Sequence, residues 1–558
     1  MSASALSPIE PLVAFLSHAL VVAQRTFAAI PGSPILVRYV RSSYRNDPGR
    51  SLLELILVIF AIRTLMQSRT RSRSQKGYVK LSEKEIDELV DEWIPEPLVQ
   101  PMDEDEAAEL SALPVIAGPS GPRPKLASNG KTVLNLANYN FTGLQNNEHI
   151  KERAVEILRK YGLGSCGPPG FYGTIDVHMD LERNIASFLG AETCIIYSQG
   201  FSTIPAVIAA FGKRGDIIVA DRGVNFAIHK GLQISRSTIR WYDHNDMKSL
   251  EETLESVAKE TKKKKWPLTR RFIVTEGIFE NDGAMSDLPK LIELKKKYGY
   301  RLVLDESMSF GSVGRTGRGL TELYNVPATD VEMIVGSMAN GLCATGGFCA
   351  GSLTVTEHQR INGTAFVFSA AMPALLAVAA SEGISILTST PSLLEALHEN
   401  VRIMRSVLEK LSPELIEIPS HPASAMIHIY IRSGLLSGNS NGSNTSVSTI
   451  NGLLQPISPV TVRTGVTATS SPAVLASAKN AVVGSDWSLE DKILQEVVDE
   501  ALAQGVMITR AKRLRGQESL EPRSSIKIVA TAALTKKESE KAAGIVKAAL
   551  TKVLGRRR

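Results

Sequence analysis

The stretch RFIVTEGIFENDGAMSDLPKLIELKKKYGYRLVLDES, residues 271–307, decides the fold of this chain. It begins and ends with short apolar runs rich in β-branched residues, which are typical of buried strands. Between them, residues 287–298 have the apolar spacing of a helix. A strand, a helix and a further strand in this order predict two parallel strands joined by a helical crossover.

Similar apolar runs occur on both sides of this stretch, and helical stretches separate several of them. These runs lie at residues 193–198, 216–220 and 332–337. Strands that alternate with helices predict a mainly parallel sheet with helices on both faces, which is an α/β architecture. We therefore expect a large domain over residues 131–390, which starts with a strand at 132–141 and a helix at 147–161.

The pattern changes in the last third of the chain, where we expect a smaller α+β domain over residues 391–558. Its predicted strands lie at 425–432, 506–510 and 525–533, and its predicted helices at 393–411 and 536–553. Thr535 and Glu538 form a capping box at the start of the last helix. Residues 433–485 contain neither acidic nor aromatic residues, and their Ser, Thr, Asn and Gly content predicts a disordered insert.

Charge is distributed unevenly along the 558 residues. The net charge is +6, but residues 1–80 alone hold eleven Lys or Arg and only three acidic residues. A nucleic-acid-binding protein would place its basic residues on the folded domain, often among aromatic side chains. Here the basic residues flank apolar runs, which favours contact with membrane lipids and argues against a nucleic-acid partner.

Two apolar stretches lie within this basic segment. Residues 11–30 are interrupted by polar residues and predict an amphipathic helix in the membrane interface. Residues 51–67 contain LLELILVIFAI and come close to the ~20 residues that cross a bilayer. We expect a single membrane span there, and the alternative is a buried helix of a soluble domain.

Residues 81–130 are expected to connect the membrane segment to the body. Ser82 and Glu85 form a capping box, and apolar residues on one face of the following helix predict that it docks onto the body. The acidic and proline-rich residues 95–123 predict an extended connector. The four cysteines lack the spacing of a metal site or of a disulfide framework, which favours reduced thiols facing the cytosol.

The stretch VGSMANGLCATGGF, residues 335–348, predicts a strand that ends in a tight loop. Loops at the ends of such strands carry the functional groups of many α/β enzymes. This loop holds no lysine, histidine or carboxylate, and Asn340 is its only polar side chain with any reach. An amide nitrogen is not a nucleophile, so we expect no covalent chemistry at this position.

Several ordered motifs together resemble those of the α-oxoamine synthases, which use pyridoxal 5'-phosphate and have the fold type I of aspartate aminotransferase. The motifs are NYNFTGL (138–144), GSCGPPGFYGTIDVHMDLE (164–182), YSQGFSTIPAVI (197–208), TEGIFENDGAMSDLPKLIELKKKYG (275–299), LDESMSFGSVGRTGRG (304–319) and FVFSAAMPA (366–374). The resemblance covers residues 95–558 apart from the insert. It implies a large domain with a mainly parallel sheet and a small C-terminal domain.

The resemblance also assigns positions in the cofactor pocket, and at most of them this chain has a different residue type from the one that the family uses. Asp305 stands where the family pairs an aspartate with the pyridinium nitrogen. Asn340 stands at the Schiff-base lysine, Asn225 at the histidine that stacks on the ring, and Met308 at a second histidine. Lys527 stands at the arginine that holds the substrate carboxylate, and lysine lacks the planar fork for that task. The resemblance therefore implies that this pocket does not turn over substrate.

Within this family, three stretches resemble the non-catalytic long-chain-base subunits: YGLGSCGPPGFYGTIDVHMDLE (161–182), NFAIHKGLQISRS (225–237) and NGLCATGGF (340–348). This resemblance implies a heterodimer with a catalytic second long-chain-base subunit, which supplies the lysine and binds pyridoxal phosphate covalently. It also implies a serine palmitoyltransferase activity of the pair, which condenses L-serine with palmitoyl-CoA to 3-ketosphinganine. The implied setting is the endoplasmic reticulum membrane with the globular domain in the cytosol, in contact with a small stimulatory subunit and membrane regulators.

Four residues are then expected to face the partner's pocket. Ser369, with Phe368 beside it, matches a segment whose hydroxyl reaches the partner's cofactor phosphate, and Cys166 and Tyr172 lie in the loop that faces the same pocket. Three of them have a simpler alternative, which is capping a turn for Ser369 and packing for Cys166 and Tyr172. Two other functions stay open: a membrane scaffold that docks regulators without lending residues, and an independent enzyme that uses another lysine.

Overall fold

The computed structural model of the chain describes residues 21–22, 25–26, 28–29, 31–71, 81–93, 98–99, 102, 104–264, 269–432, 486–511, 518–520 and 522–556. It divides into two compact units, Met1–Ser111 and Ala112–Arg558. The predicted insert at 433–485 and most of the predicted interfacial helix at 11–30 lie outside the described residues. These two predictions therefore remain predictions.

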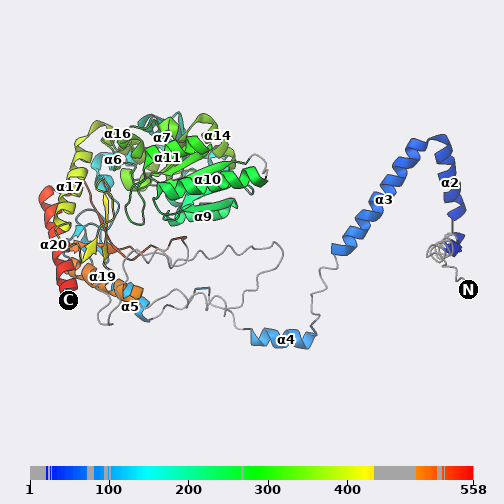
Figure 1. Cartoon of the computed structure of the whole chain (residues 1–558). Helices are drawn as coiled ribbons and strands as arrows, with labels where there is room; N and C mark the ends of the chain where they lie inside the picture. The colour runs from blue at the N-terminus through cyan, green and yellow to red at the C-terminus, as the bar shows by residue number, and fades with distance from the viewer. Residues whose placement is uncertain are drawn as a thin grey trace, which may run out of the picture. The chain divides into compact units, whose positions relative to one another are not determined.

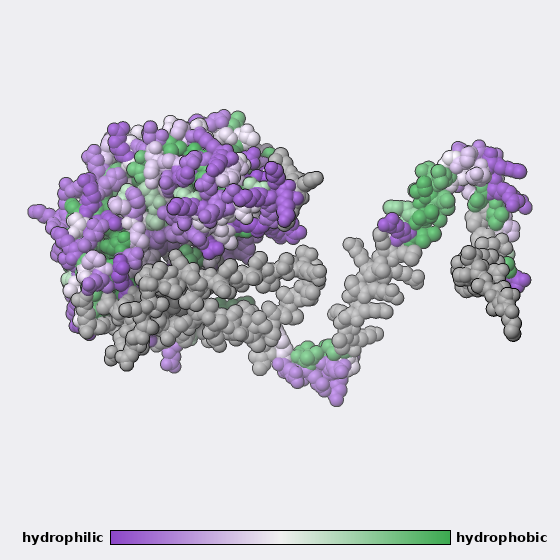
Figure 2. Space-filling view, viewed as in Figure 1, coloured by the Kyte–Doolittle hydropathy of each residue, from purple (hydrophilic) through white to green (hydrophobic). Residues whose placement is uncertain are grey.

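The first unit is helical (Figure 1). Its main elements are α2 (Ser33–Asn46), α3 (Pro48–Arg71), α4 (Glu83–Glu92) and α5 (Glu104–Ser111). The predicted span at 51–67 lies within α3, whose apolar side chains are exposed on all sides from Leu52 to Leu65, as the hydrophobic colouring in Figure 2 shows. Judged by length and composition, no single helix among the described residues qualifies as a membrane span, and only the bent pair Ala374–Ser389 and Ser392–Leu408 passes together.

One expectation about the connector differs from the structure. The capping box of Ser82 and Glu85 is present at the start of α4. The docking of α4 onto the body stays a prediction, because α4 and the body belong to different units. The connector is not fully extended, because α5 forms within it, where acidic residues favour a helix N-terminus and alanines favour the helix interior.

The second unit is built around a seven-stranded sheet with the order β4-β10-β9-β8-β7-β5-β6. Its strands are β4 (Thr193–Tyr197), β5 (Ile217–Asp221), β6 (Thr238–Tyr242), β7 (Arg271–Glu276), β8 (Arg301–Asp305), β9 (Met333–Ser337) and β10 (Gly347–Gly351). All five strands predicted for this sheet are confirmed. Only β10 runs antiparallel to its two neighbours, so the sheet is mainly parallel, as predicted.

Helices cover both faces of this sheet. They include α7 (Asp176–Leu189), α11 (Leu288–Tyr298) and α16 (Ala374–Ser389) on one face and α8 (Gly200–Phe211) and α9 (Phe226–Ser235) on the other. Successive side chains of a strand point to opposite faces. In β8, Leu302 and Leu304 accordingly join the first apolar cluster, while Val303 joins the second. Burial on both faces explains why these strands are continuously apolar in the sequence.

The C-terminal part forms the predicted smaller α+β region. A four-stranded sheet with the order β11-β12-β15-β14 packs with three helices. Its elements are β11 (Ile416–Glu417), β12 (Met426–Ile431), β14 (Thr509–Arg510), β15 (Ile526–Val529), α17 (Ser392–Leu408), α19 (Asp486–Ala503) and α20 (Lys536–Gly555). The Thr535–Glu538 capping box is confirmed. The helix α19 was not predicted.

The predicted strand at 132–141 is much shorter in the structure. Within it, β3 (Leu134–Asn135) pairs in parallel with β13 (Val506–Met507), and Thr132 forms an isolated antiparallel bridge with Lys125. The Asn135 side chain accepts a hydrogen bond from the Ala137 backbone N–H, which turns the chain away from extended geometry. This short pairing joins the beginning of the large domain to the C-terminal α+β region.

Candidate active site

The parallel strands β7, β8 and β9 end at one edge of the sheet, where the cofactor positions were predicted. Glu276 and Asp305 are the last residues of β7 and β8 and lie opposite one another in the strand register. β9 leads directly into α13 (Met338–Leu342), which carries Asn340. The expected tight loop after β9 is thus a short helix. The carboxyl edge of a parallel sheet is the usual location of a site in this architecture.

Asn340 is buried, with 9% of its surface exposed. Its amide Nδ2 donates to the backbone oxygen of Ser307 over 3.0 Å and lies 3.5 Å from the sulfur of Met308. Asn340 and Met308, which stand at the predicted lysine and second histidine positions, therefore contact each other directly. The amide is held as a hydrogen-bond donor inside the protein and offers no nucleophile.

Asn225, at the predicted ring-stacking position, also has a structural role. Its Oδ1 caps α9 by accepting from the backbone N–H of Ile228, and its Nδ2 donates to Asp305 Oδ2 over 3.4 Å. The remaining carboxylate oxygen of Asp305 accepts from the Ser307 backbone N–H. Asp305 is thus bonded to neighbours within its own pocket.

A second buried carboxylate, Glu276, accompanies Asp305 and was not singled out from the sequence. Its oxygens accept from the backbone N–H groups of Asn225 at 2.6 Å and Glu280 at 3.0 Å. Burial, with the neighbouring Asp305 charge, raises the pKa of Glu276 well above its usual range, and burial also raises the pKa of Asp305. The available sequence signal for this pair was the carboxylate at the end of each apolar strand, in TEG and in LDES.

Glu306 is a third buried carboxyl group at this edge. Burial raises its pKa to about 7. Hydrogen bonds that it accepts from Ser309 Oγ and the Leu320 backbone N–H lower the pKa, but by less than burial raises it. Because all three carboxyl groups are buried close together, their protonated forms are favoured, and a further negative charge at this edge is disfavoured.

Lys527, at the predicted carboxylate-binding position, is engaged by an aromatic side chain. Its Nζ donates to Tyr139 Oη over 2.6 Å and lies 4.4 Å from the centre of the Tyr139 ring. Tyr139 Oη in turn donates to Glu280. A hydrogen-bonded chain thus runs from Lys527 through Tyr139, Glu280 and Glu276 to Asn225.

The four residues predicted to face a partner lie elsewhere, on two adjacent loops. The loop before α7 and the loop before α16 are joined by hydrogen bonds from Ala371 N to Gly167 O at 2.9 Å and from Ser165 Oγ to Ala371 O at 2.8 Å. Cys166 and Tyr172 lie on the first loop, and Phe368 and Ser369 on the second. The structure therefore brings all four into one neighbourhood.

Most of this neighbourhood is open to solvent. Cys166 is exposed, and Tyr172 and Phe368 expose 101% and 82% of their surface. Phe171 is also exposed and was not singled out from the sequence. Aromatic side chains that protrude side by side from ordered loops are typical of protein interfaces.

The conformation of the first loop is defined by its backbone. Cys166 and Tyr172 have positive φ angles of 55° and 64°. At Gly173 any side chain is excluded, because a Cβ atom there would lie 2.1 Å from the backbone oxygen of Gly167. This crowding holds the loop in the shape that projects Tyr172 outwards.

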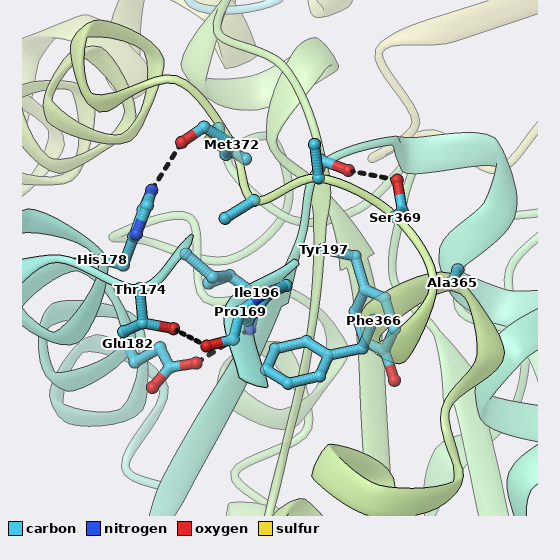
Figure 3. Close-up of a pocket in the computed structure, with 13 residues that line it drawn as sticks. Pro169, Thr174, His178, Glu182, Ile196, Tyr197, Ala365, Phe366, Ser369 and Met372 are labelled. Atoms are coloured by element: carbon cyan, nitrogen blue, oxygen red, sulfur yellow. Dashed lines mark hydrogen bonds between the residues drawn. The ribbon is translucent and has the colours of Figure 1, made fainter. Parts of the chain in front are cut away.

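Ser369 borders a small cavity below these loops (Figure 3). Its hydroxyl lies 3.4 Å from that of Ser198, which directly follows β4. Across the cavity, His178 is buried, and its two ring nitrogens bond to the backbone N–H of Ile175 and to the oxygen of Met372. The cavity measures about 20 Å³, which is space for about one water molecule.

The residues at the lysine, ring-stacking and carboxylate positions do not fit a covalently held pyridoxal phosphate. Asn340 donates to Ser307 and contacts Met308, and Asn225 donates to Asp305, so these side chains offer neither a nucleophile nor a stacking ring. Of the assigned positions, only Asp305 keeps the expected chemistry, and it is already paired. We therefore assign no reaction step to this chain's own pocket.

The fold is that of the pyridoxal-phosphate-dependent aminotransferases. The family model for aminotransferase class I and II matches residues 131–451, and the chain belongs to this family. Among solved structures, it is similar to a high-resolution structure of SPT with a PLP internal aldimine, with a TM-score of 0.64, 18% identity and coverage of 85% of this chain and 98% of that one. A similar likeness, with a TM-score of 0.54, links it to 8-amino-7-oxononanoate synthase from Francisella tularensis.

Relatives with higher sequence identity carry more specific names. The chain is 35% identical to Serine palmitoyltransferase 1 of Saccharomyces cerevisiae over 93% of this chain and 92% of the yeast protein. It is 45% identical to Long chain base biosynthesis protein 1b of Oryza sativa over 63% of this chain and 71% of the rice protein.

Proposed function

We propose that this chain is a subunit of a serine palmitoyltransferase, a transferase of sphingolipid synthesis that condenses L-serine with palmitoyl-CoA to 3-ketosphinganine. We further propose that the chain itself performs no turnover. The observation that carries this proposal is the buried Asn340 amide, which donates to Ser307 and contacts Met308 where the family holds its lysine. The names of the most similar relatives support the choice of reaction.

The chain's contribution in this proposal is made to a catalytic second long-chain-base subunit that binds pyridoxal phosphate covalently. Ser369 presents a hydroxyl to the cofactor phosphate of that subunit, and Phe368, Cys166 and Tyr172 shape the wall around it. These proposed roles are supported by the position of the four residues on two loops that are hydrogen-bonded to each other and largely exposed to solvent. The backbone constraint at Gly173 keeps these groups in place before the partner arrives.

The membrane is the proposed setting. The helix α3 exposes apolar side chains around its whole circumference, a surface that water disfavours and lipid tolerates. Basic residues lie on either side of this helix, which favours anionic headgroups. We propose an endoplasmic reticulum membrane with the second unit in the cytosol, and contacts with a small stimulatory subunit and membrane regulators.

The test is to purify the chain alone and together with its catalytic subunit. We expect no Schiff-base absorbance and no 3-ketosphinganine from the chain alone, and both from the co-expressed pair. A Schiff-base band in the isolated chain that borohydride abolishes would overturn the proposal. It would instead show that another lysine of this chain holds the cofactor.

A second candidate function is a membrane scaffold that docks regulators without lending residues to a partner's site. The exposed apolar face of α4, with Ile86, Leu89 and Trp93, is the observation that favours it. Turnover that is unchanged in the co-expressed pair after Ser369→Ala and Cys166→Ala, with assembly intact, would support the scaffold. A fall in turnover would support the shared active site.

A further inference from the structure

The helices α2 and α3 form a hairpin with a groove between them. A hydrogen bond of 3.0 Å from Ser51 Oγ to Ser43 Oγ joins them near the turn, and Tyr39 Oη donates to Glu54 over 3.2 Å further along. The groove has a volume of about 890 Å³. Ligand pockets usually measure roughly 300–1,000 Å³, so the groove is large enough for a sizeable ligand.

The walls of this groove are mainly apolar. α2 contributes Val37 and Val40, and α3 contributes Leu52, Leu55 and Val58. On each helix these side chains are three positions apart, so they form one continuous stripe along it. Two such stripes facing each other suit an elongated hydrocarbon chain.

Charge within the groove is concentrated at Arg41 and Glu54. Glu54 is already satisfied, because it accepts from Arg50 Nε over 3.0 Å and from Tyr39 Oη. Arg41 forms no ion pair with any carboxylate of the part of the chain that the structure describes. The helix α2 also carries Arg38 and Arg45 and has no acidic residue, so the groove presents an uncompensated positive charge.

We propose that this groove binds one anionic phospholipid, with an acyl chain along the apolar stripes and the headgroup phosphate on Arg41. A guanidinium beside apolar walls favours a phosphate, which it can bind through two parallel N–H groups. Hydrocarbon walls alone would not select among bilayer lipids, because all acyl chains are equally apolar. Selection therefore comes from the charge of Arg41. The inference rests on the proposed insertion of α3 into a membrane.

The test uses the full chain with its catalytic subunit in nanodiscs of phosphatidylcholine with a minority of phosphatidylserine. Native mass spectrometry after release from the discs measures which lipid stays bound. We expect retained phosphatidylserine in excess of its share in the disc. Arg41→Gln should lower this preference about fivefold, the effect expected for one Arg beside an anionic lipid.

Two further variants separate the groove from general surface charge. Arg45→Gln removes the same charge from the same helix at a position that does not line the groove, and it should leave the preference within twofold. Val40→Trp fills the groove and should lower the retention of both lipids. Equal losses in Arg41→Gln and Arg45→Gln, or retention unchanged in Val40→Trp, would overturn the proposal.

The outcome also distinguishes this inference from the membrane proposal on which it rests. If the chain does not enter the discs at all, the proposed membrane insertion fails. If it enters them but retains no lipid, or if a cysteine placed at Val40 crosslinks to a helix of the co-expressed subunit, only the lipid site fails.

Discussion

Two regions of the second unit differ in burial: the cofactor positions, and the two exposed loops that carry Cys166, Tyr172, Phe368 and Ser369. We call these two loops the rim loops, or the rim. In the pocket, Asn225, Asp305 and Asn340 are buried and their polar atoms are bonded within the chain. On the rim, Tyr172 and Phe368 protrude into solvent. The cofactor positions are therefore part of the buried core of this chain, whereas the rim loops present an exposed surface.

The proposed function makes different demands on these two regions. In it the pocket needs only to stay folded, and its polar groups can satisfy each other. The rim loops, which in the same proposal complete a partner's site, need both exposure and a fixed shape. Substitutions in the pocket should accordingly change stability, and substitutions on the rim should change assembly and turnover of the pair.

The largest effect is expected from a charge placed on the rim. Phe368→Asp combined with Tyr172→Asp should weaken assembly with the catalytic subunit at least a hundredfold, because unpaired charges buried in an interface cost about 3 kcal/mol or more. Co-purification and sedimentation measure the loss. Leu323→Asp changes an exposed apolar residue of α12 (Leu320–Leu323) and serves as the control. Equal weakening by the control would contradict the distinction between rim and remaining surface.

The next effect concerns Glu306 in the pocket and its dependence on pH. Its pKa is about 7 in the folded chain, above its ordinary value of 4.5. The folded state therefore binds the proton more tightly, and this stabilisation is complete below pH 4.5 and is lost as pH rises through 7. Between pH 5 and 7 the free energy of unfolding should fall by roughly 2 kcal/mol from this group.

Glu306→Gln removes this contribution, so its stability relative to the native chain should rise with pH over that range. Urea unfolding at several pH values measures the difference. The same change at Glu395, an exposed residue of α17, is the control. A parallel pH dependence in the native chain and Glu306→Gln would assign the effect to other groups.

A smaller effect is expected when the rim hydroxyl is removed. Ser369→Ala in the co-expressed pair should lower kcat/KM about tenfold, because a hydrogen bond to a charged group contributes about 1.5–3 kcal/mol. Assembly should be unchanged. Ser406→Ala, which removes an exposed hydroxyl from α17, should leave the rate unaltered. Full activity in Ser369→Ala would remove this residue from the shared site.

The smallest effect belongs to the amide in the pocket. Asn340→Ala should lower the free energy of unfolding by about 1 kcal/mol, because it leaves the Ser307 backbone oxygen without this donor. The specific activity of the assembled pair should not change. Thermal unfolding and initial rates check the two halves of this prediction, and a loss of activity without loss of stability would place Asn340 in the chemistry.

The sequence was sufficient to predict those elements whose signals are local. Continuous apolar strands, as in RLVLD, and capping boxes, as at Thr535 and Glu538, depend on residues within a few positions of each other. The strands β6 and β10 were missed because TIRWY has an arginine at its centre and GFCAG is rich in glycine and small residues. Neither has the hydrophobic signature on which the other strands were recognised.

The same distinction between local and long-range signals applies to the candidate site. Its positions could be assigned from motif resemblance, but the bonds between them could not. Asn340 meets Ser307 and Met308, and Asn225 meets Asp305, across spans of the chain that only the folded sheet brings together.

The pairing of Leu134 with Val506 has a consequence for how the chain is made. The two residues are about 370 positions apart, and synthesis proceeds at roughly 5–20 residues per second. The early strand therefore waits on the ribosome for roughly 20–70 s before its partner exists. During that interval the apolar side chains of Leu136 and Phe141, which are fully buried in the folded chain, lack this part of their cover, and truncated products that end before Val506 should be rapid substrates for degradation.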